Sequence, residues 1–349
     1  MTQIKMGLIG GTGLGEALRQ RTEGIRHQIE TPFGAPSDEI TETEWEGLPA
    51  FFLSRHGPGH TLNPSQVPYR ANIFALKKLG VTHIIASGAV GSLREEFKPR
   101  DLVVPDQIID KTIKRPNTFF ERSAVHVEFA EPFCPILRRI LIEEGAAPAQ
   151  DVPADEQESI SASPRLRVPA SSFTTHGRGC YVCMEGPAFS TRAESLMHRL
   201  WGGDLIGMTC MPEAKLAREA EIAYALIALV TDYDCWRRPQ MPAATDQRAT
   251  RVDQAALLKE IIANLQAASD NAAALIQRVL ARIATDPGEL AASPALRALE
   301  LAIWTDKSRI PPDQVELLAP LWVKYFGLSA KPADPGWEST TGWGMSERS

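Results

Sequence analysis

The chain has few cysteines, no long apolar run and no excess of positive charge. Its 349 residues include five cysteines, an odd number that does not suggest a disulfide framework. It contains no uncharged apolar stretch of about 18 residues, so no membrane span is expected. The formal net charge is −6, which argues against non-specific binding to nucleic acid. We therefore expect a cytoplasmic protein that binds neither membranes nor nucleic acids.

Common nucleotide and metal motifs are also missing. Residues 10–13 (GGTG) follow a short apolar strand, but a dinucleotide fingerprint needs a further glycine where Glu16 stands. The lysine of a phosphate-binding loop is missing too. Cys180 and Cys183 form a single pair, whereas a zinc site needs a second pair. What remains is a glycine turn whose backbone amides can approach an anion, with the Thr12 hydroxyl as a further donor.

Apolar segments with strand and helix periodicity alternate along the chain and predict an α/β domain with a largely parallel sheet. Strands are expected at residues 5–9, 51–54, 81–86, 101–109, 181–184, 205–208 and 223–231. Helices are expected at residues 69–79, 135–144, 190–201, 212–221 and 253–283. Residues 146–176 predict a mobile insertion. Residues 284–349 predict a C-terminal extension, with short helices around 296–304 and 315–325 and then poor order.

Several polar residues follow predicted strands, and ligands bind at such strand ends in parallel α/β sheets. Arg55 offers a planar fork that suits phosphate, and His56 beside it can donate or titrate. Residues 87–89 (SGA) follow another strand. Asp232 and Asp234 come after the last strand and could read a base edge or donate a proton. Each pattern alone also fits a turn or a helix cap, but their common position favours one site.

Eight segments make the chain similar to the purine nucleoside phosphorylase superfamily, and within it to the methylthioadenosine phosphorylases. In order, they are GLIGGTGL, TPFGAPSD, SRHGPGHT, GSLREE, AEPFCP, EGPAFSTRAES, MTCMPEAKLAREA and TDYDCW. They cover roughly residues 4–236, and a weaker helical match reaches residue 283. The resemblance implies one domain (1–283) with a distorted mixed β-sheet flanked by helices. It also implies a homotrimer that needs no metal or cofactor and uses inorganic phosphate as co-substrate.

The resemblance also assigns roles to individual residues. The phosphate would bind to Thr12, Arg55, His56, Gly88, Ala89 and Thr209. Met208 would pack on the ribose and offer its backbone amide to a hydroxyl. The base would contact Phe189, Ser190, Asp232 and Asp234. The 5′ group would lie against Val252 and Ala255, and His126 would reach into the 5′ pocket of the neighbouring subunit.

The implied reaction is phosphorolysis of 5′-methylthioadenosine to adenine and 5-methylthioribose 1-phosphate. Phosphate attacks C1′ while the purine leaves, and Asp232 is the expected acid at N7. Acceptor carboxylates suit the 6-amine of adenine, whereas 6-oxopurine enzymes of the superfamily carry Glu in place of Ser190 and Asn in place of Asp232. Methylthioinosine, inosine or guanosine remain alternative substrates. Another 5′-modified adenosine is a further alternative, because Ala255 and Ala256 would make the 5′ pocket roomier. A non-catalytic nucleoside-binding protein is less favoured, since the site residues are intact.

Overall fold

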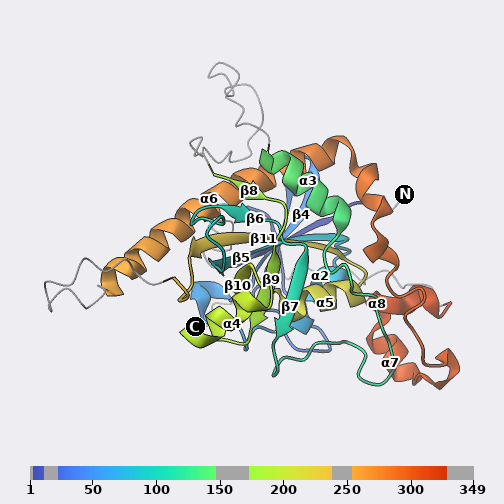
Figure 1. Cartoon of the computed structure of the whole chain (residues 1–349). Coiled ribbons are helices and arrows are strands. Elements are labelled where there is room, and N and C mark those ends of the chain that lie inside the picture. The colour runs from blue at the N-terminus through green and yellow to red at the C-terminus, as the bar shows by residue number, and fades with distance from the viewer. Residues whose placement is uncertain (1–2, 12–22, 147–172, 238–253, 328–349) are drawn as a thin grey trace, which may run out of the picture.

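The computed structural model describes residues 3–11, 23–146, 173–237 and 254–327 (Figure 1). Across these ranges, eleven strands form one mixed sheet that is covered by helices on both faces. The α/β fold with a mixed, helix-flanked sheet is thus confirmed. Most of the predicted insertion, and the predicted disordered end of the chain, lie outside the described residues. Among the described helices, none is long and apolar enough to cross a membrane.

The sheet combines parallel and antiparallel pairs. Its strands are β1 (Met6–Gly10), β2 (Ile25–His27), β3 (Ile40–Trp45), β4 (Leu48–Ser54), β5 (His83–Ser92), β6 (Leu102–Val103), β7 (Gln107–Lys111), β8 (Thr175–His176), β9 (Cys180–Met184), β10 (Leu205–Gly207) and β11 (Ala223–Asp232). The main path runs β2-β3-β4-β1-β5-β10-β9-β7, while β11 lies beside β5 and β6. β3 pairs antiparallel with β4, and β10 with β5, but most pairings among the described strands are parallel, so the expectation of a largely parallel sheet is confirmed.

Strand β5 is longer than predicted. We expected the chain to leave the sheet at Ser87, but its pairing with β11 continues to Gly91. Gly88 and Ala89 therefore lie inside a strand and not in a loop. The small residues that suggested a loop instead allow other groups to approach the strand closely.

The strand predicted over residues 101–109 is two strands in the structure, β6 and β7. Pro105 lies between them, and a proline has no N–H to give to the ladder. The two halves consequently join different neighbours, because β6 pairs with β11 and β8, whereas β7 pairs with β9.

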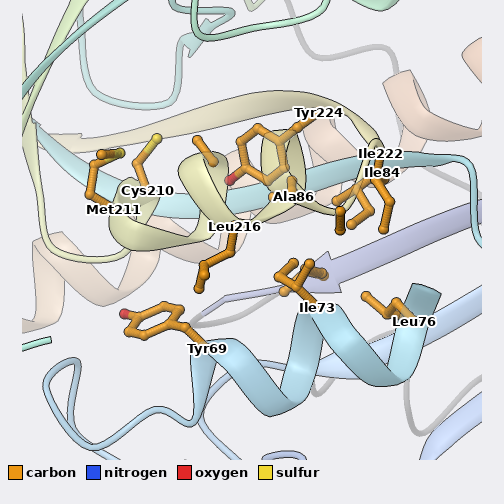
Figure 2. Packing of buried hydrophobic residues seen from close by; sticks show 14 of the residues in the cluster. Tyr69, Ile73, Leu76, Ile84, Ala86, Cys210, Met211, Leu216, Ile222 and Tyr224 are labelled. Atoms are coloured by element: carbon orange, nitrogen blue, oxygen red, sulfur yellow. The ribbon is translucent and has the colours of Figure 1, made fainter. Parts of the chain in front are cut away.

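Helices cover the sheet in two layers. They are α2 (Tyr69–Lys78), α3 (Pro135–Ala146), α4 (Arg192–Leu200), α5 (Cys210–Glu219), α6 (Gln254–Thr285), α7 (Pro312–Leu317) and α8 (Ala319–Trp322). α3 and α6 pack on one face, and α2 and α5 pack on the other (Figure 1). Figure 2 shows how Tyr69 and Ile73 of α2 meet Leu216 of α5 and Tyr224 of β11. This packing fixes α5, whose first residues follow the predicted ribose and phosphate contacts.

The described part of the C-terminal extension contributes to the cores on both faces. Leu290 joins the α3–α6 side, while Leu299 and Trp322 join the α2–α5 side. The helix expected around residues 296–304 is wrong, because a 3-10 turn (Pro294–Arg297) is followed by further turns and by Ile303, which forms a β-bridge with Val125. The helix expected around residues 315–325 appears as the short helices α7 and α8 and a 3-10 turn.

Candidate active site

The carboxyl ends of β1 and β4 meet the middle of β5 at one place. The Arg55 N–H donates to the Gly10 carbonyl at 3.0 Å, and the Gly11 N–H donates to the Ser87 hydroxyl at 3.3 Å. A Cβ on Gly11 would lie 2.8 Å from both Arg55 Nη1 and the Ser87 carbonyl, and 3.4 Å from the Gly88 Cα. The glycine turn is therefore needed so that Arg55 can approach the strand ends.

Arg55 and Glu213 form a buried ion pair. Arg55 Nε lies 2.7 Å from Glu213 Oε2, and Nη2 lies 2.8 Å from Oε1. Both side chains are at most 1% exposed, and the Tyr224 hydroxyl also donates to Glu213 at 2.8 Å. Burial alone would lower the pKa of Arg55, but the charge of Glu213 raises it above its ordinary value. The guanidinium is thus held charged and in one orientation.

Arg55 retains N–H groups that the described residues do not engage. A guanidinium has five N–H groups; two donate to Glu213, and one on Nη1 donates to the Ser87 carbonyl at 2.7 Å. The two that remain, one on each terminal nitrogen, form a fork suited to phosphate oxygens. Thr209 Oγ1 lies 3.3 Å from where a Cβ on Gly88 would stand, so these two predicted phosphate residues are adjacent.

His56 is buried and neutral near pH 7. Its Nδ1 lies 2.8 Å from the Leu62 carbonyl, which can only accept, so Nδ1 carries the proton. Burial, reinforced by the charge of Arg55, lowers the pKa of His56 to about 4. Its Nε2 therefore presents a lone pair. The ring stacks on His60 at 4.2 Å, but the described residues contain no cluster of three or more metal-binding side chains.

Strand β11 carries a bulge just before Asp232. The pairing with β5 skips Thr231, and Asp232 pairs with Gly91. A bulge bends its strand and changes the direction of the next side chain. A Cβ on Gly91 would lie 3.3 Å from Asp232 Oδ1 and 3.2 Å from the Asp234 Cβ. Gly91 therefore leaves room for the two carboxylates side by side.

Both carboxylate oxygens of Asp232 lie at hydrogen-bond distance from neighbouring polar groups. Oδ1 accepts the Asp234 N–H at 2.7 Å, while Oδ2 lies 2.7 Å from the Thr231 hydroxyl. That hydroxyl has one hydrogen and also lies 3.2 Å from the Val90 carbonyl, which can only accept. Thr231 can therefore donate to only one of these two acceptors at a time, Asp232 Oδ2 or the Val90 carbonyl.

Asp234 lies beside Asp232 and is held by Ser195. The Ser195 hydroxyl donates to Asp234 Oδ2 at 2.5 Å. Burial raises the pKa of Asp234 above 3.8, and the charge of Asp232 adds to this, while the hydrogen bond from Ser195 opposes it. Hydrogen bonds from Cys235 also act to lower the pKa of Asp234. The structure thus brings together the two carboxylates that the sequence predicted as a pair.

The predicted ribose and base residues have different surroundings. A Cβ on Gly186 would lie 2.6 Å from Met208 Sδ, so the glycine lets Met208 lie against this turn. The Ser190 carbonyl accepts the Cys235 thiol at 3.3 Å, which ties the base-reading turn to the segment after Asp234. Phe189 is 85% exposed in the single chain and has the open ring face that stacking on a base requires.

Two of the predicted site residues, Thr12 and Val252, lie outside the described residues. Ala255 lies in the exposed first turn of α6. His126 is exposed and contacts the C-terminal extension: its N–H donates to the Ala302 carbonyl at 2.9 Å, and its ring meets Trp304 edge-on at 4.6 Å. The described C-terminal extension therefore supports the segment that carries His126.

Sequence reasoning missed three residues that organise the site, namely Glu213, Ser195 and Arg115. The first two lie inside the quoted segments MTCMPEAKLAREA and EGPAFSTRAES, yet nothing local shows their partners. Arg55 and Glu213 are separated by 158 residues. A charged residue in a helix with apolar neighbours was the available signal for Glu213, because a buried charge needs a partner.

Comparison with known proteins assigns the family. A profile of the phosphorylase superfamily matches residues 5–281. The chain belongs to this superfamily. It is 44% identical to an S-methyl-5′-thioadenosine phosphorylase of Synechocystis sp., over 93% of this chain and 89% of that protein. A crystal structure of methylthioadenosine phosphorylase from an antarctic soil metagenomic library is similar with a TM-score of 0.73 and 42% identity, covering 92% of this chain and 99% of that one. A Schistosoma mansoni methylthioadenosine phosphorylase with tubercidin bound gives a TM-score of 0.70 at 33% identity, covering 86% of this chain and 99% of that one.

The alignment with the methylthioadenosine phosphorylases extends further along the chain than the eight quoted segments suggested. The motifs placed the C-terminal extension outside the resemblance, but the extension is nearly a fifth of the chain. Alignments that cover 93% of the chain must include most of it. That expectation is therefore wrong, in agreement with the packing of Leu299 and Trp322 in the core.

Proposed function

We propose that the protein cleaves 5′-methylthioadenosine with inorganic phosphate, giving adenine and 5-methylthioribose 1-phosphate. The observation that carries the proposal is the fixed, charged Arg55 fork at Ser87 of β5, with Thr209 next to Gly88 and two adjacent carboxylates next to Gly91 of the same strand. The relatives that align with almost the whole chain bear the name of this activity. As a pentosyltransferase, the enzyme would serve purine and methionine salvage.

Phosphate is bound by charge and by matched donors. The two remaining Arg55 N–H groups and the Thr209 hydroxyl donate to its oxygens. The lone pair of His56 Nε2 can accept from a hydroxyl, so it suits a phosphate that carries one proton. This local arrangement attracts an anion even though the net charge of the protein is −6.

Cleavage of the C1′–N9 bond makes the ribosyl ring positive and the base negative. The bound phosphate stabilises the positive ring and then forms the new bond to C1′. Asp232 gives a proton or a hydrogen bond to N7, which stabilises the leaving purine. Asp234 accepts from the 6-amine, and Ser195 keeps it in place. A 6-oxopurine has no such amine, so the paired carboxylates favour adenine.

The decisive experiment is incubation of the protein with 5′-methylthioadenosine, with and without phosphate. Adenine release that requires phosphate supports the proposal, and 5-methylthioribose 1-phosphate appears in equal amount. Release without phosphate would indicate hydrolysis, and no release would reject the activity. Parallel assays with methylthioinosine, inosine, guanosine and other 5′-modified adenosines test the alternative substrates.

We also propose that the protein is a homotrimer. Exposed apolar side chains lie on α4, where Leu200 is 88% exposed and Trp201 53%. Others lie on the C-terminal extension beside His126, where Leu301 is 89% exposed and Trp304 71%. Large exposed apolar groups commonly mark interfaces, and two different patches suit a closed ring. Light scattering on the purified protein should give three times the monomer mass of 38.2 kDa; a monomer would contradict the proposal.

The dependence of kcat/KM on pH should reflect the ionisation of Asp234. We expect the acid limb of kcat/KM for the adenine nucleoside to lie above the ordinary aspartate range, because burial raises the pKa of Asp234. As the pH falls through that pKa, the carboxylate gains a proton and loses its capacity to accept from the 6-amine. Ser195→Ala removes a hydrogen bond that lowers the pKa, so the limb should move to higher pH. An unchanged limb in this variant would contradict the assignment.

A further inference from the structure

Arg115 is a buried arginine next to the site. It follows β7, and its side chain is 1% exposed. Its guanidinium donates to backbone carbonyls at the ends of β9 and β10, to one at the start of α5, and to a side chain of α2. The acceptors are the carbonyls of Met208, Met211 and Glu185 (2.6 Å each), the Met184 carbonyl (3.4 Å), the Tyr69 hydroxyl (3.2 Å) and Glu185 Oε1 (3.3 Å).

The segments that Arg115 joins carry different parts of the proposed nucleoside site. Met208 follows β10 and is the proposed ribose contact. Glu185 follows β9 and begins the turn that leads to Phe189 and Ser190, the proposed base contacts. The two segments approach closely, because Met208 Sδ lies 2.6 Å from where a Cβ on Gly186 would stand. The relative position of the ribose and base contacts thus depends on how these two strand ends are joined.

Glu185 in turn holds Arg115 in place. Partial burial alone would raise the pKa of Glu185. The carboxylate, however, accepts hydrogen bonds from the Ile113 and Lys114 N–H groups and from the Ser65 hydroxyl. Together with the charge of Arg115, these bonds lower the pKa of Glu185 to about 2. The carboxylate is therefore ionised at neutral pH. Ser65 belongs to the loop that follows the proposed phosphate residues Arg55 and His56.

We propose that Arg115 is a positioning residue for the nucleoside, which fixes the ribose contact at Met208 relative to the base-reading turn that starts at Glu185. This inference rests on the proposed function. A guanidinium suits the task because its donors lie in one rigid plane and reach carbonyls on several sides. A lysine keeps the charge but has a single nitrogen, so it cannot hold both strand ends in the same geometry.

Arg138 offers a matched control. It is a half-buried arginine on α3 that also donates to backbone carbonyls, those of Pro105, Gly177 and Val104. None of these belongs to the proposed site. Arg138→Lys therefore removes a similar set of contacts from the fold without touching the nucleoside residues.

The test compares steady-state kinetics of Arg115→Lys and Arg138→Lys with varied nucleoside and varied phosphate. We expect Arg115→Lys to raise KM for the nucleoside about tenfold or more, since a displacement of about 1 Å can cost 100-fold. KM for phosphate should rise less, because Arg115 contacts neither Arg55, Glu213 nor Ser87 and reaches the phosphate site only through the segment 208–211 that carries Thr209. Arg138→Lys should change neither KM, even if it lowers the thermal midpoint.

The inference is overturned if Arg115→Lys leaves the nucleoside KM unchanged, if it raises both KM values equally, or if Arg138→Lys has the same effect. If Arg115→Lys does not fold, the kinetics of Glu185→Gln test the inference. This substitution weakens the contacts that hold Arg115 and should also raise KM for the nucleoside. Failure of the proposed function is separate from these outcomes, since it would appear as lack of turnover in the unaltered protein.

Discussion

Glu213→Gln should lower the free energy of unfolding by about 3–5 kcal/mol, because it leaves the charge of Arg55 buried without its partner. The substitution keeps the size of the side chain, so the loss comes from charge and not from a cavity. The freed guanidinium should also lose its fixed orientation, which raises KM for phosphate. Urea denaturation monitored by fluorescence measures the first effect, and initial rates at varied phosphate measure the second.

Glu121→Gln is the matched control for this prediction. Glu121 pairs with Arg70 on the surface and is 64% exposed, so water screens the interaction. Its loss should cost at most about 1 kcal/mol and leave phosphate kinetics unchanged. Equal destabilisation in the two variants would refute the view that the buried pair is a distinct structural element.

Asp232→Asn should reduce kcat/KM for the adenine nucleoside by about 10²–10⁴-fold, the usual contribution of a general acid. The local fold should persist. An asparagine can still accept the Asp234 N–H through Oδ1 and can donate to the Thr231 hydroxyl through Nδ2. The loss then reflects the missing acid at N7, and the circular dichroism spectrum and phosphate binding should be those of the unaltered protein.

Asp106→Asn provides the comparison for Asp232→Asn. Asp106 also accepts a backbone N–H, that of Gly179 at 2.9 Å, but it lies between β6 and β7. We expect nearly normal turnover in this variant. If Asp232→Asn itself kept turnover within about threefold of the unaltered protein, the acid role of Asp232 would be rejected.

The sequence predicted the parts of the fold and site that depend on local pattern. Helix α2 matched its apolar spacing, and Arg55 and Asp232 stood out because each follows a strand. The length of β5 could not be read in this way, because Ser87 and Gly88 resemble a turn until β11 pairs alongside them. The bulge at Thr231 could not be predicted for the same reason. A register shift is defined by the pairing of two strands, so the sequence of one strand does not show it.

Buried polar partners were the least predictable feature. Glu213 and Arg115 make their contacts with residues far away along the chain, so their roles depend on tertiary structure. A family resemblance supplied the residues that we propose touch substrate, but it did not supply the residues that hold those in place. The structure adds this supporting layer.

The burial of Trp322 has a consequence for how the chain folds during synthesis. This side chain is fully buried, touches Phe120 at 4.8 Å between ring centroids, and belongs to the same core as α2 and β11. Synthesis proceeds from the N-terminus, so the α2–α5 core lacks one of its largest members until residue 322 has been made. This core is therefore completed only after every strand of the described sheet and all the proposed site residues have been made.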